Sequence, residues 1–287
     1  MLEPKIIVDF PHHNAECPLW HPQQQYLYWT DIPRGKLYRY NPQTQTHSEI
    51  YSGESVGGLT LQADGSLVLF KTKGTVQIWD EGKITTLIDE IPAEKHTRFN
   101  DAIADPAGRV FSGTMATSED KGRLYRIDTD GSIHVILEEL LVPNGMGFSP
   151  DLKYFYLTDS DTYTIYRFDY NQETGNITNQ QNHIIIPQGQ GVPDGMTVDA
   201  EGYIWSARWD GSSLYRYTPQ GMEVLRIQFP ALKVSCLAFG GSDYSEIYAT
   251  TAGGNNRSQE GAGAGAIFHL QSKVKGVPEF TSRIVIS

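Results

Sequence analysis

The stretch VPNGMGFSPDLKYFYLTDSDTYTIYRFDY, Val142 to Tyr170, decides how the whole chain is organised. It contains three short strand-like runs, and the second and third are rich in Tyr, Phe, Ile and Thr, the residues that favour strands. The SPD triplet after the first run and the SDT triplet after the second are turn signals. The stretch therefore predicts a small antiparallel sheet.

The same unit recurs six times along the 287 residues. Copies of the third run begin at Gly35, Gly74, Gly122, Tyr163, Ser212 and Gly265, roughly 40 to 50 residues apart. Each follows a second run: QYLYWT, SLVLFK, RVFSGT, YFYLTD, YIWSAR and EIYATT. Several short strands repeated at this period are typical of β-propeller blades. The sequence therefore predicts an all-β chain, with residues 1–287 forming a single six-bladed β-propeller domain with a central channel.

Three further features of the sequence bear on the propeller interpretation. Tyr38, Tyr125, Tyr166 and Tyr215, in the repeated Tyr-Arg phrases, are expected to pack between blades, with the intervening Arg pointing outward. HVILEELL, from His134 to Leu141, is the best helix candidate but is short enough to be strand and turn. GNNRSQEGAGAGA, from Gly254, is interpreted as a loop within the last blade.

Composition limits the classes of partner. The formal net charge is −11 and Lys and Arg do not cluster, which argues against binding nucleic acid or an anionic membrane. No apolar run approaches the length of a transmembrane helix, and the N-terminus lacks the pattern of a secretory signal. With only Cys17 and Cys236, a cytoplasmic location is expected, with two buried free thiols favoured over a disulfide. We expect a monomer or weak homodimer.

The first run of each blade begins with a residue at one equivalent position. These six residues are Glu16, Gly57, Asn100, Asn144, Asp194 and Ser235. Because the first strand of a propeller blade lines the channel, they are expected to form a ring near the axis. Five of the six carry side-chain oxygen, and such oxygens are ligands that Ca²⁺, Mg²⁺ or Mn²⁺ prefer. The alternative is a wet channel mouth whose polar groups only hold water.

At this ring the sequence resembles the family of senescence marker protein 30, also called regucalcin or gluconolactonase. Four phrases carry the resemblance: RFNDAIADPAGRVFSGTM, PNGMGFS, PDGMTVDAEGYIW and FGGSDYSEIYATTAG. The resemblance implies a six-bladed propeller with one divalent metal near the axis and hydrolysis of sugar lactones such as gluconolactone. It implies Ca²⁺ first, with Zn²⁺, Mn²⁺, Mg²⁺ and Fe²⁺ as alternatives.

The resemblance also assigns roles to residues. It makes Glu16, Asn144 and Asp194 the metal ligands, Asp194 the catalytic general base, and Arg98 and Asn100 substrate contacts. Two departures from the family pattern follow. Cys17 stands where the family typically has Gly. Thr117 stands where many members have an acidic substrate contact, so Glu119, two places later, is the candidate replacement.

Alternatives to a lactonase remain open from the sequence. A hydrolase of organophosphates or aryl esters would use the same site, and a calcium-binding regulatory propeller or an interaction propeller would bind without turnover. For Arg98 the alternative is an ion pair with Asp101 or Glu94. His12 and His13 are adjacent on an extended run and therefore point to opposite faces, which disfavours joint metal binding. Trp20 and Met146 are expected to pack in the core.

Overall fold

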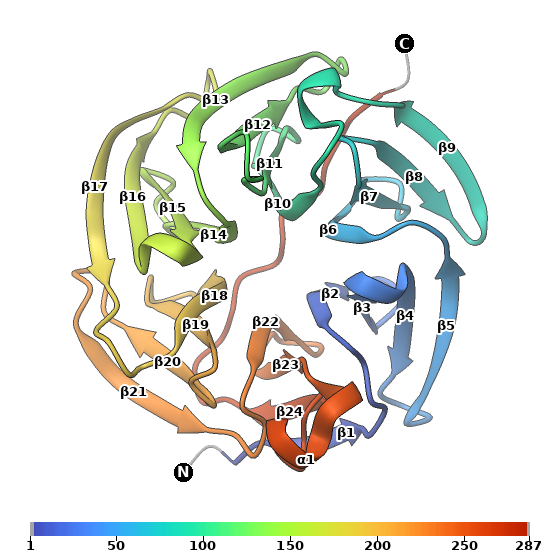
Figure 1. Ribbon diagram of the computed structural model, residues 1–287, viewed down its shortest axis with the longest axis vertical. Helices are drawn as coiled ribbons and strands as arrows, with labels where there is room; N and C mark the ends of the chain where they lie inside the picture. The colour runs from blue at the N-terminus through green and yellow to red at the C-terminus, as the bar shows by residue number, and fades with distance from the viewer. Residues whose placement is uncertain (1–2, 286–287) are drawn as a thin grey trace.

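The computed structural model describes residues 3–285, and its six four-stranded antiparallel sheets surround one central axis (Figure 1). The strands of the first three blades, from the axis outward, are β2 (Ala15–His21), β3 (Tyr26–Asp31), β4 (Lys36–Asn41) and β5 (Thr46–Ser52); β6 (Val56–Leu61), β7 (Leu67–Lys71), β8 (Val76–Asp80) and β9 (Lys83–Ile88); β10 (Phe99–Ala104), β11 (Val110–Thr114), β12 (Gly122–Ile127) and β13 (Ile133–Leu140). The six-bladed propeller is confirmed, and the segment 134–141 lies mainly in a strand, not a helix.

The other three blades follow the same order. Their strands are β14 (Pro143–Phe148), β15 (Tyr154–Asp159), β16 (Thr164–Tyr170) and β17 (Ile177–Ile185); β18 (Val192–Val198), β19 (Ile204–Trp209), β20 (Ser213–Tyr217) and β21 (Glu223–Gln228); β22 (Val234–Gly240), β23 (Glu246–Thr251), β24 (Ile267–Gln271) and β1 (Lys5–Val8). Short helical turns occur at η1 (Ile32–Arg34), η2 (Pro92–Glu94), η3 (Ser160–Thr162), η4 (Gly254–Asn256) and α1 (Arg257–Glu260). The last two lie between β23 and β24, within the final blade as predicted.

The ring of blades is closed by the N-terminal strand. β1 pairs antiparallel with β24, with Ile6 opposite Phe268, and so supplies the outer strand of the sixth blade. The next strand along the chain, β2, is the inner strand of the first blade. Sheet hydrogen bonds therefore join the two ends of the repeat array.

Buried apolar clusters occupy the spaces between neighbouring blades. Between the sixth and first blades, for example, the ring of Trp20 stacks on Tyr248 with centroids 5.5 Å apart. Between the fourth and fifth blades Tyr156 packs with Met196 and Tyr215. Six such clusters are found among the described residues, one for each gap between blades. The core is therefore divided among the interfaces, and Trp20 and Met146 belong to it as predicted.

The expected outward direction of the repeated arginines is wrong for Arg39 and Arg126. The tyrosines are buried or half-buried as predicted, but Arg126 is only 8% exposed and donates hydrogen bonds to the fourth blade, at Thr174 O and Asn176 Oδ1. Arg39 likewise reaches Glu81 of the second blade, at 3.2 Å. The other two arginines bond within their own blades, Arg167 to Gln181 and Arg216 to Asp199.

The C-terminal segment 272–285 crosses the middle of the ring (Figure 1). Its backbone bonds at or beside the turns that join first and second strands in four blades, the second, third, fifth and sixth. Ala200 N donates to Lys275 O at 2.9 Å, Ser282 N donates to Leu61 O at 2.8 Å, and Arg283 N donates to Gly108 O at 2.9 Å. The segment therefore covers the end of the channel where the first strands finish, and leaves open the end where they begin.

Glycine follows the ring residue where first strands approach closely. A Cβ on Gly145 would overlap the backbone nitrogen of Met196, and one on Gly195 would overlap the thiol of Cys236. Cys17 occupies the same position in the first blade with φ 52°, in the left-handed region that favours glycine. This backbone favours glycine, the residue that the resemblance implies at the position of Cys17.

Cys17 and Cys236 offer a matched test of that backbone difference, since both are 7% exposed and face one cavity, and Cys236 lacks the positive φ. At Cys236 we expect glycine to be less stable than alanine by about 0.5–1 kcal/mol, the usual cost of glycine in a strand. At Cys17 we expect the glycine variant to be at least as stable as the alanine variant, because glycine accepts the left-handed backbone. Urea unfolding of the four variants measures both differences, and the same ranking at both positions would contradict the argument.

Candidate functional site

A β-bulge occurs at the ring position in every blade. The pairing register between the first and second strands shifts at residues 16–19, 56–58, 99–101, 143–146, 193–196 and 234–236. A bulge bends its strand and redirects a side chain. The ring residues therefore lie at or beside the place where each first strand departs from regular pleating at the open end of the channel.

Five of the predicted site residues line one cavity of about 370 Å³ at this end: Glu16, Arg98, Asn100, Asn144 and Asp194. The other two members of the six-residue ring do not line it. Gly57 lies against Phe99 and Arg98, where a side chain would overlap them, and the Ser235 hydroxyl donates to Ala15 O at 2.6 Å. The predicted convergence on the axis is thus observed for the residues with larger polar side chains.

The two carboxylates of the cavity are buried close enough to influence each other. Glu16 is 7% exposed and Asp194 is 5% exposed. Burial raises the pKa of Glu16 well above its usual range, and the charge of Asp194 raises it further. Burial likewise raises the pKa of Asp194 well above its usual range, against the hydrogen bond from Asn144. Two buried carboxylates in one site need positive charge to remain ionised, and Arg98 is the cation that lines the cavity.

Hydrogen bonding leaves oxygen atoms of this set available to a cation. Asn144 Nδ2 donates to Asp194 Oδ1 and to Ser160 Oγ, and no described residue donates to Asn144 Oδ1. Cys17 N donates to Glu16 Oε2 at 3.2 Å, and no described residue donates to Oε1. Among the described residues no three His, Cys, Asp or Glu side chains group to hold an ion. A set with one amide and two carboxylates nevertheless fits Ca²⁺, Mg²⁺ or Mn²⁺.

Arg98 and Asn100 are fixed to one another on β10 and the loop before it. Arg98 Nη1 donates to Asn100 Oδ1 at 2.8 Å and to Phe99 O at 2.9 Å, while Asn100 Nδ2 donates to Pro143 O at 3.0 Å. The suggested ion pair of Arg98 with Asp101 or Glu94 is not formed, because Glu94 binds Arg123 instead. Arg98 lines the cavity, and its Nε and Nη2 have no partner among the described residues, so these donors are available to a ligand.

Glu119 is not brought to the cavity. It lies with Thr117 in a separate small depression that shares Met115 with the site, and its backbone nitrogen donates to Thr117 Oγ1. A substrate contact by Glu119 stays a prediction. His12 is buried in the first-blade core, bonded to Gly265 O and Trp29, and is not a cavity residue.

The structure adds residues that sequence reasoning missed. Asn14, Ser160, Asp161, Trp209 and Asp210 line the cavity. Asn14 Oδ1 is buried without a hydrogen-bond partner in the described structure, so it is available to a ligand. Most of these residues follow a second strand, in the phrases TDSDT and RWDGS. The signal was present in the repeat, because those turns and the first strands begin at the same end of the blades.

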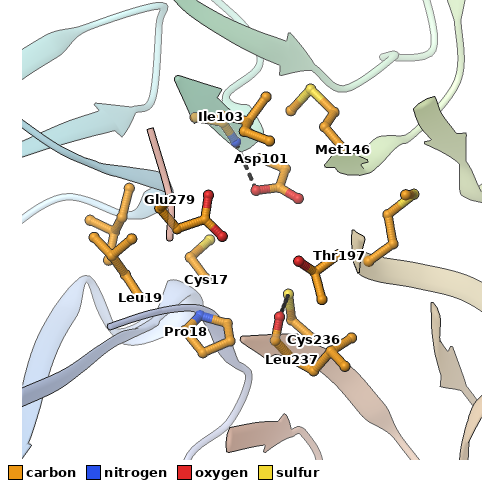
Figure 2. A pocket seen from close by; sticks show the side chains of 13 residues that line it. Cys17, Pro18, Leu19, Asp101, Ile103, Met146, Thr197, Cys236, Leu237 and Glu279 are labelled. Carbon is orange, nitrogen blue, oxygen red and sulfur yellow. Dashed lines mark hydrogen bonds between the residues drawn. The ribbon is translucent and has the colours of Figure 1, made fainter. Parts of the chain in front are cut away.

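A second, smaller cavity of about 50 Å³ lies in the channel between the site and the C-terminal segment (Figure 2). The carboxylates of Asp101 and Glu279 both point into it, and the thiols of Cys17 and Cys236 face it from the neighbouring first and sixth blades. Burial raises the pKa of Asp101 to about 7 and that of Glu279 to about 7, and Glu279 adds to the shift on Asp101. The two cysteines are free and buried, as predicted.

Comparison with known proteins now identifies the family. Residues 14–253 match the family described as the SMP-30/Gluconolactonase/LRE-like region. The chain belongs to this family. It is 42% identical to pentonolactonase XacC of Haloferax volcanii, over 97% of both chains, and 31% identical to 6-deoxy-6-sulfogluconolactonase of Pseudomonas putida, over 96% of this chain and 97% of that one.

Among solved structures the propeller resembles regucalcin of Agrobacterium tumefaciens, described as a calcium-binding protein. The TM-score is 0.91 at 24% identity, covering 99% of this chain and 98% of the other. At that identity the likeness supports the fold alone.

No helix in residues 3–285 has the length and apolarity to cross a membrane.

The carboxylates of the channel cavity predict a pH dependence of stability. Since folding raises the pKa of Asp101 and Glu279 from about 4 to about 7, the folded state holds more protons, and stability falls as pH rises between these values. Glu279→Gln should reduce this loss by on the order of 1–3 kcal/mol. Urea unfolding at pH 5 and pH 8 measures it, with the exposed Glu173→Gln as control, and an equal pH slope in wild type and Glu279→Gln would contradict it.

Proposed function

We propose that the chain hydrolyses sugar lactones at this cavity with one divalent cation held by Glu16, Asn144 and Asp194. The observation that carries the proposal is the pair of buried carboxylates sharing one cavity with free amide oxygens and a free guanidinium edge. The lactonase names of its relatives support the activity, and Ca²⁺ is placed first because carboxylate and amide oxygens are ligands that it prefers.

A lactone is a cyclic ester, so its hydrolysis needs a polarised carbonyl, an activated water and stabilisation of the tetrahedral intermediate. A divalent cation in the site supplies electrophilic polarisation of the carbonyl. Asp194 supplies the general base: its Oδ1 accepts the Asn144 amide, leaving Oδ2 to take a proton from water. The water oxygen bonds to the carbonyl carbon, the ring C–O bond breaks, and the released oxygen takes a proton to give a hydroxy acid.

Arg98 and Asn100 orient the substrate in this scheme. The Arg98 guanidinium is held by Asn100 and Phe99 through one nitrogen, so its other donors keep a defined direction. Fixed donors of this kind suit the hydroxyl and carbonyl oxygens of a polyhydroxylated ring. Asn14 adds a buried amide oxygen that can accept from a substrate hydroxyl.

Asp194→Asn tests the ligand and base together. We expect kcat on gluconolactone to fall at least about 100-fold, because the general base is lost. We also expect that adding Ca²⁺ to the metal-stripped variant no longer raises its Tm, because a metal ligand is lost. A pH-indicator assay and thermal unfolding with Ca²⁺, Mg²⁺, Mn²⁺, Zn²⁺ and Fe²⁺ in turn measure both. Asp80→Asn, which removes an exposed carboxylate on β8 away from the cavity, is the control. Full activity of Asp194→Asn, or no lactone turnover by wild type with any ion, would refute the proposal.

Arg98→Lys separates positioning from chemistry. Lysine keeps the charge but loses the planar donors, so we expect KM for gluconolactone to rise about 10-fold with a smaller change in kcat. Steady-state kinetics give both parameters. Arg39→Lys, on the outer part of the first blade, should leave both unchanged. An unaltered KM in Arg98→Lys would show that Arg98 does not contribute to substrate binding.

A further inference from the structure

A larger hollow adjoins the site cavity over the gap between the fourth and fifth blades. This side pocket, of about 640 Å³, is lined by Tyr163, Ile186, Gln188, Gly189, Gly191, Val192 and Asp210. Val192 and Asp210 line both the side pocket and the site cavity, so the two spaces are neighbours sharing one wall. The site cavity alone already has the volume of a pocket for a small ligand, roughly 300 Å³ or more. A monosaccharide lactone therefore does not need the side pocket.

Tyr163 stands in the side pocket with an unusual backbone. It ends the helical turn η3 with φ 55°, in the left-handed region, and its side chain is 41% exposed. Bulky residues seldom adopt this conformation, which costs on the order of 1–3 kcal/mol. The equivalent residue of the first blade, after η1, is Gly35 with φ 60°.

The repeat shows that the fold accepts glycine at this position. The third strand is preceded by Gly35, Gly74 and Gly265 in three blades, each with positive φ, and by Ser212 with φ 49° in the fifth. Tyr163 is the aromatic exception. Its backbone is held on both sides, because its N–H donates to Ser160 O and its carbonyl accepts from Ile186 N. A half-exposed aromatic ring on a fixed, costly backbone is a feature that ligand binding explains and blade packing does not.

The rest of the lining indicates the chemistry of the ligand. Gln188 offers an amide, Asp210 a carboxylate, and Gly189 and Gly191 leave backbone groups accessible. None of the described residues that line the side pocket is cationic, and Lys233 beside it is paired with Asp210 at 3.0 Å. An aromatic face with neutral and acidic hydrogen-bonding groups suits an uncharged polyhydroxylated ring, whose C–H face packs on tyrosine while its hydroxyls bond to amide and carboxylate. It disfavours phosphate, sulfate or carboxylate groups.

We propose that the side pocket is a subsite for a second sugar, so that the enzyme accepts neutral lactones derived from disaccharides. This inference rests on the proposed lactonase function of the adjoining cavity. The lactone ring lies in the site cavity, its glycosyl substituent passes Val192 and Asp210, and the second ring packs on Tyr163. No bond of the substituent changes; the same ester C–O bond is hydrolysed.

Kinetics with two lactones test the subsite. The kcat/KM of cellobionolactone and gluconolactone is measured for wild type, Tyr163→Asn and Tyr163→Phe. Asn tolerates the left-handed backbone and removes the ring, whereas Phe keeps the ring and removes only the hydroxyl. We expect Tyr163→Asn to lose about 10-fold on cellobionolactone with gluconolactone within twofold, and Tyr163→Phe to stay within about threefold of wild type on both.

Product binding separates failure of the subsite from failure of the proposed function. Calorimetric titration with cellobionate and gluconate should show tighter binding of cellobionate by wild type, and Tyr163→Asn should remove the difference. If wild type hydrolyses neither lactone, the lactonase proposal fails and the titration alone decides the subsite. The subsite is overturned if cellobionate binds no tighter than gluconate, or if Tyr163→Asn lowers kcat/KM equally for both lactones.

Discussion

The pairing of β1 with β24 is the interaction on which the site depends. It closes the sixth blade with the N-terminal strand, and so holds the first blade beside the last. Glu16 comes from the first blade, Arg98 and Asn100 from the third, Asn144 from the fourth and Asp194 from the fifth. Residues so far apart in the chain share a cavity because the ring is closed. Each gap between blades is filled by its own apolar cluster, so every blade is held by the two blades beside it.

The charge distribution follows from the same architecture. First strands converge on the axis, and their bulges direct polar side chains into one cavity, where the Glu16 and Asp194 side chains are buried. Carboxylates placed there are costly without positive charge. Arg98 supplies one charge within the chain, and the proposed cation supplies the rest at the open end. At the other end Asp101 and Glu279 face each other without a nearby cation along the cavity lining, which is why burial dominates their pKa.

Differences among the six blades carry the functional information. The blades differ in sequence where a side chain has a local role. Asn144 and Asp194 occupy one equivalent position in two blades, and Gly35 and Tyr163 occupy another. The first difference combines a neutral oxygen donor with a carboxylate that can accept a proton. The second places an aromatic ring where the fold favours glycine. In both cases the departure from the repeat, more than the repeat itself, indicates chemistry.

Much of the fold was predictable from the sequence because the repeat is local. The spacing of the strand runs predicted six blades, and the equivalent leading residues predicted which side chains would meet at the axis. Glu119 shows a limit of prediction from sequence. Its place two residues after Thr117 did not reveal that the loop holds both residues in a depression separate from the site cavity. The arginines of the Tyr-Arg phrases show another, because strand alternation gives the face of a sheet but not what covers that face.

The sequence by itself determined the blade, its sixfold repetition and the polar ring, since these depend on strand propensity and on period. Tertiary structure alone decided the path of the C-terminal segment across the channel, the convergence of Asp101 and Glu279, and the side pocket beside Tyr163. These features arise from contacts between segments of unrelated sequence. Their geometry is fixed only when six blades pack around one axis, because no local pattern encodes which turns and tails then become neighbours.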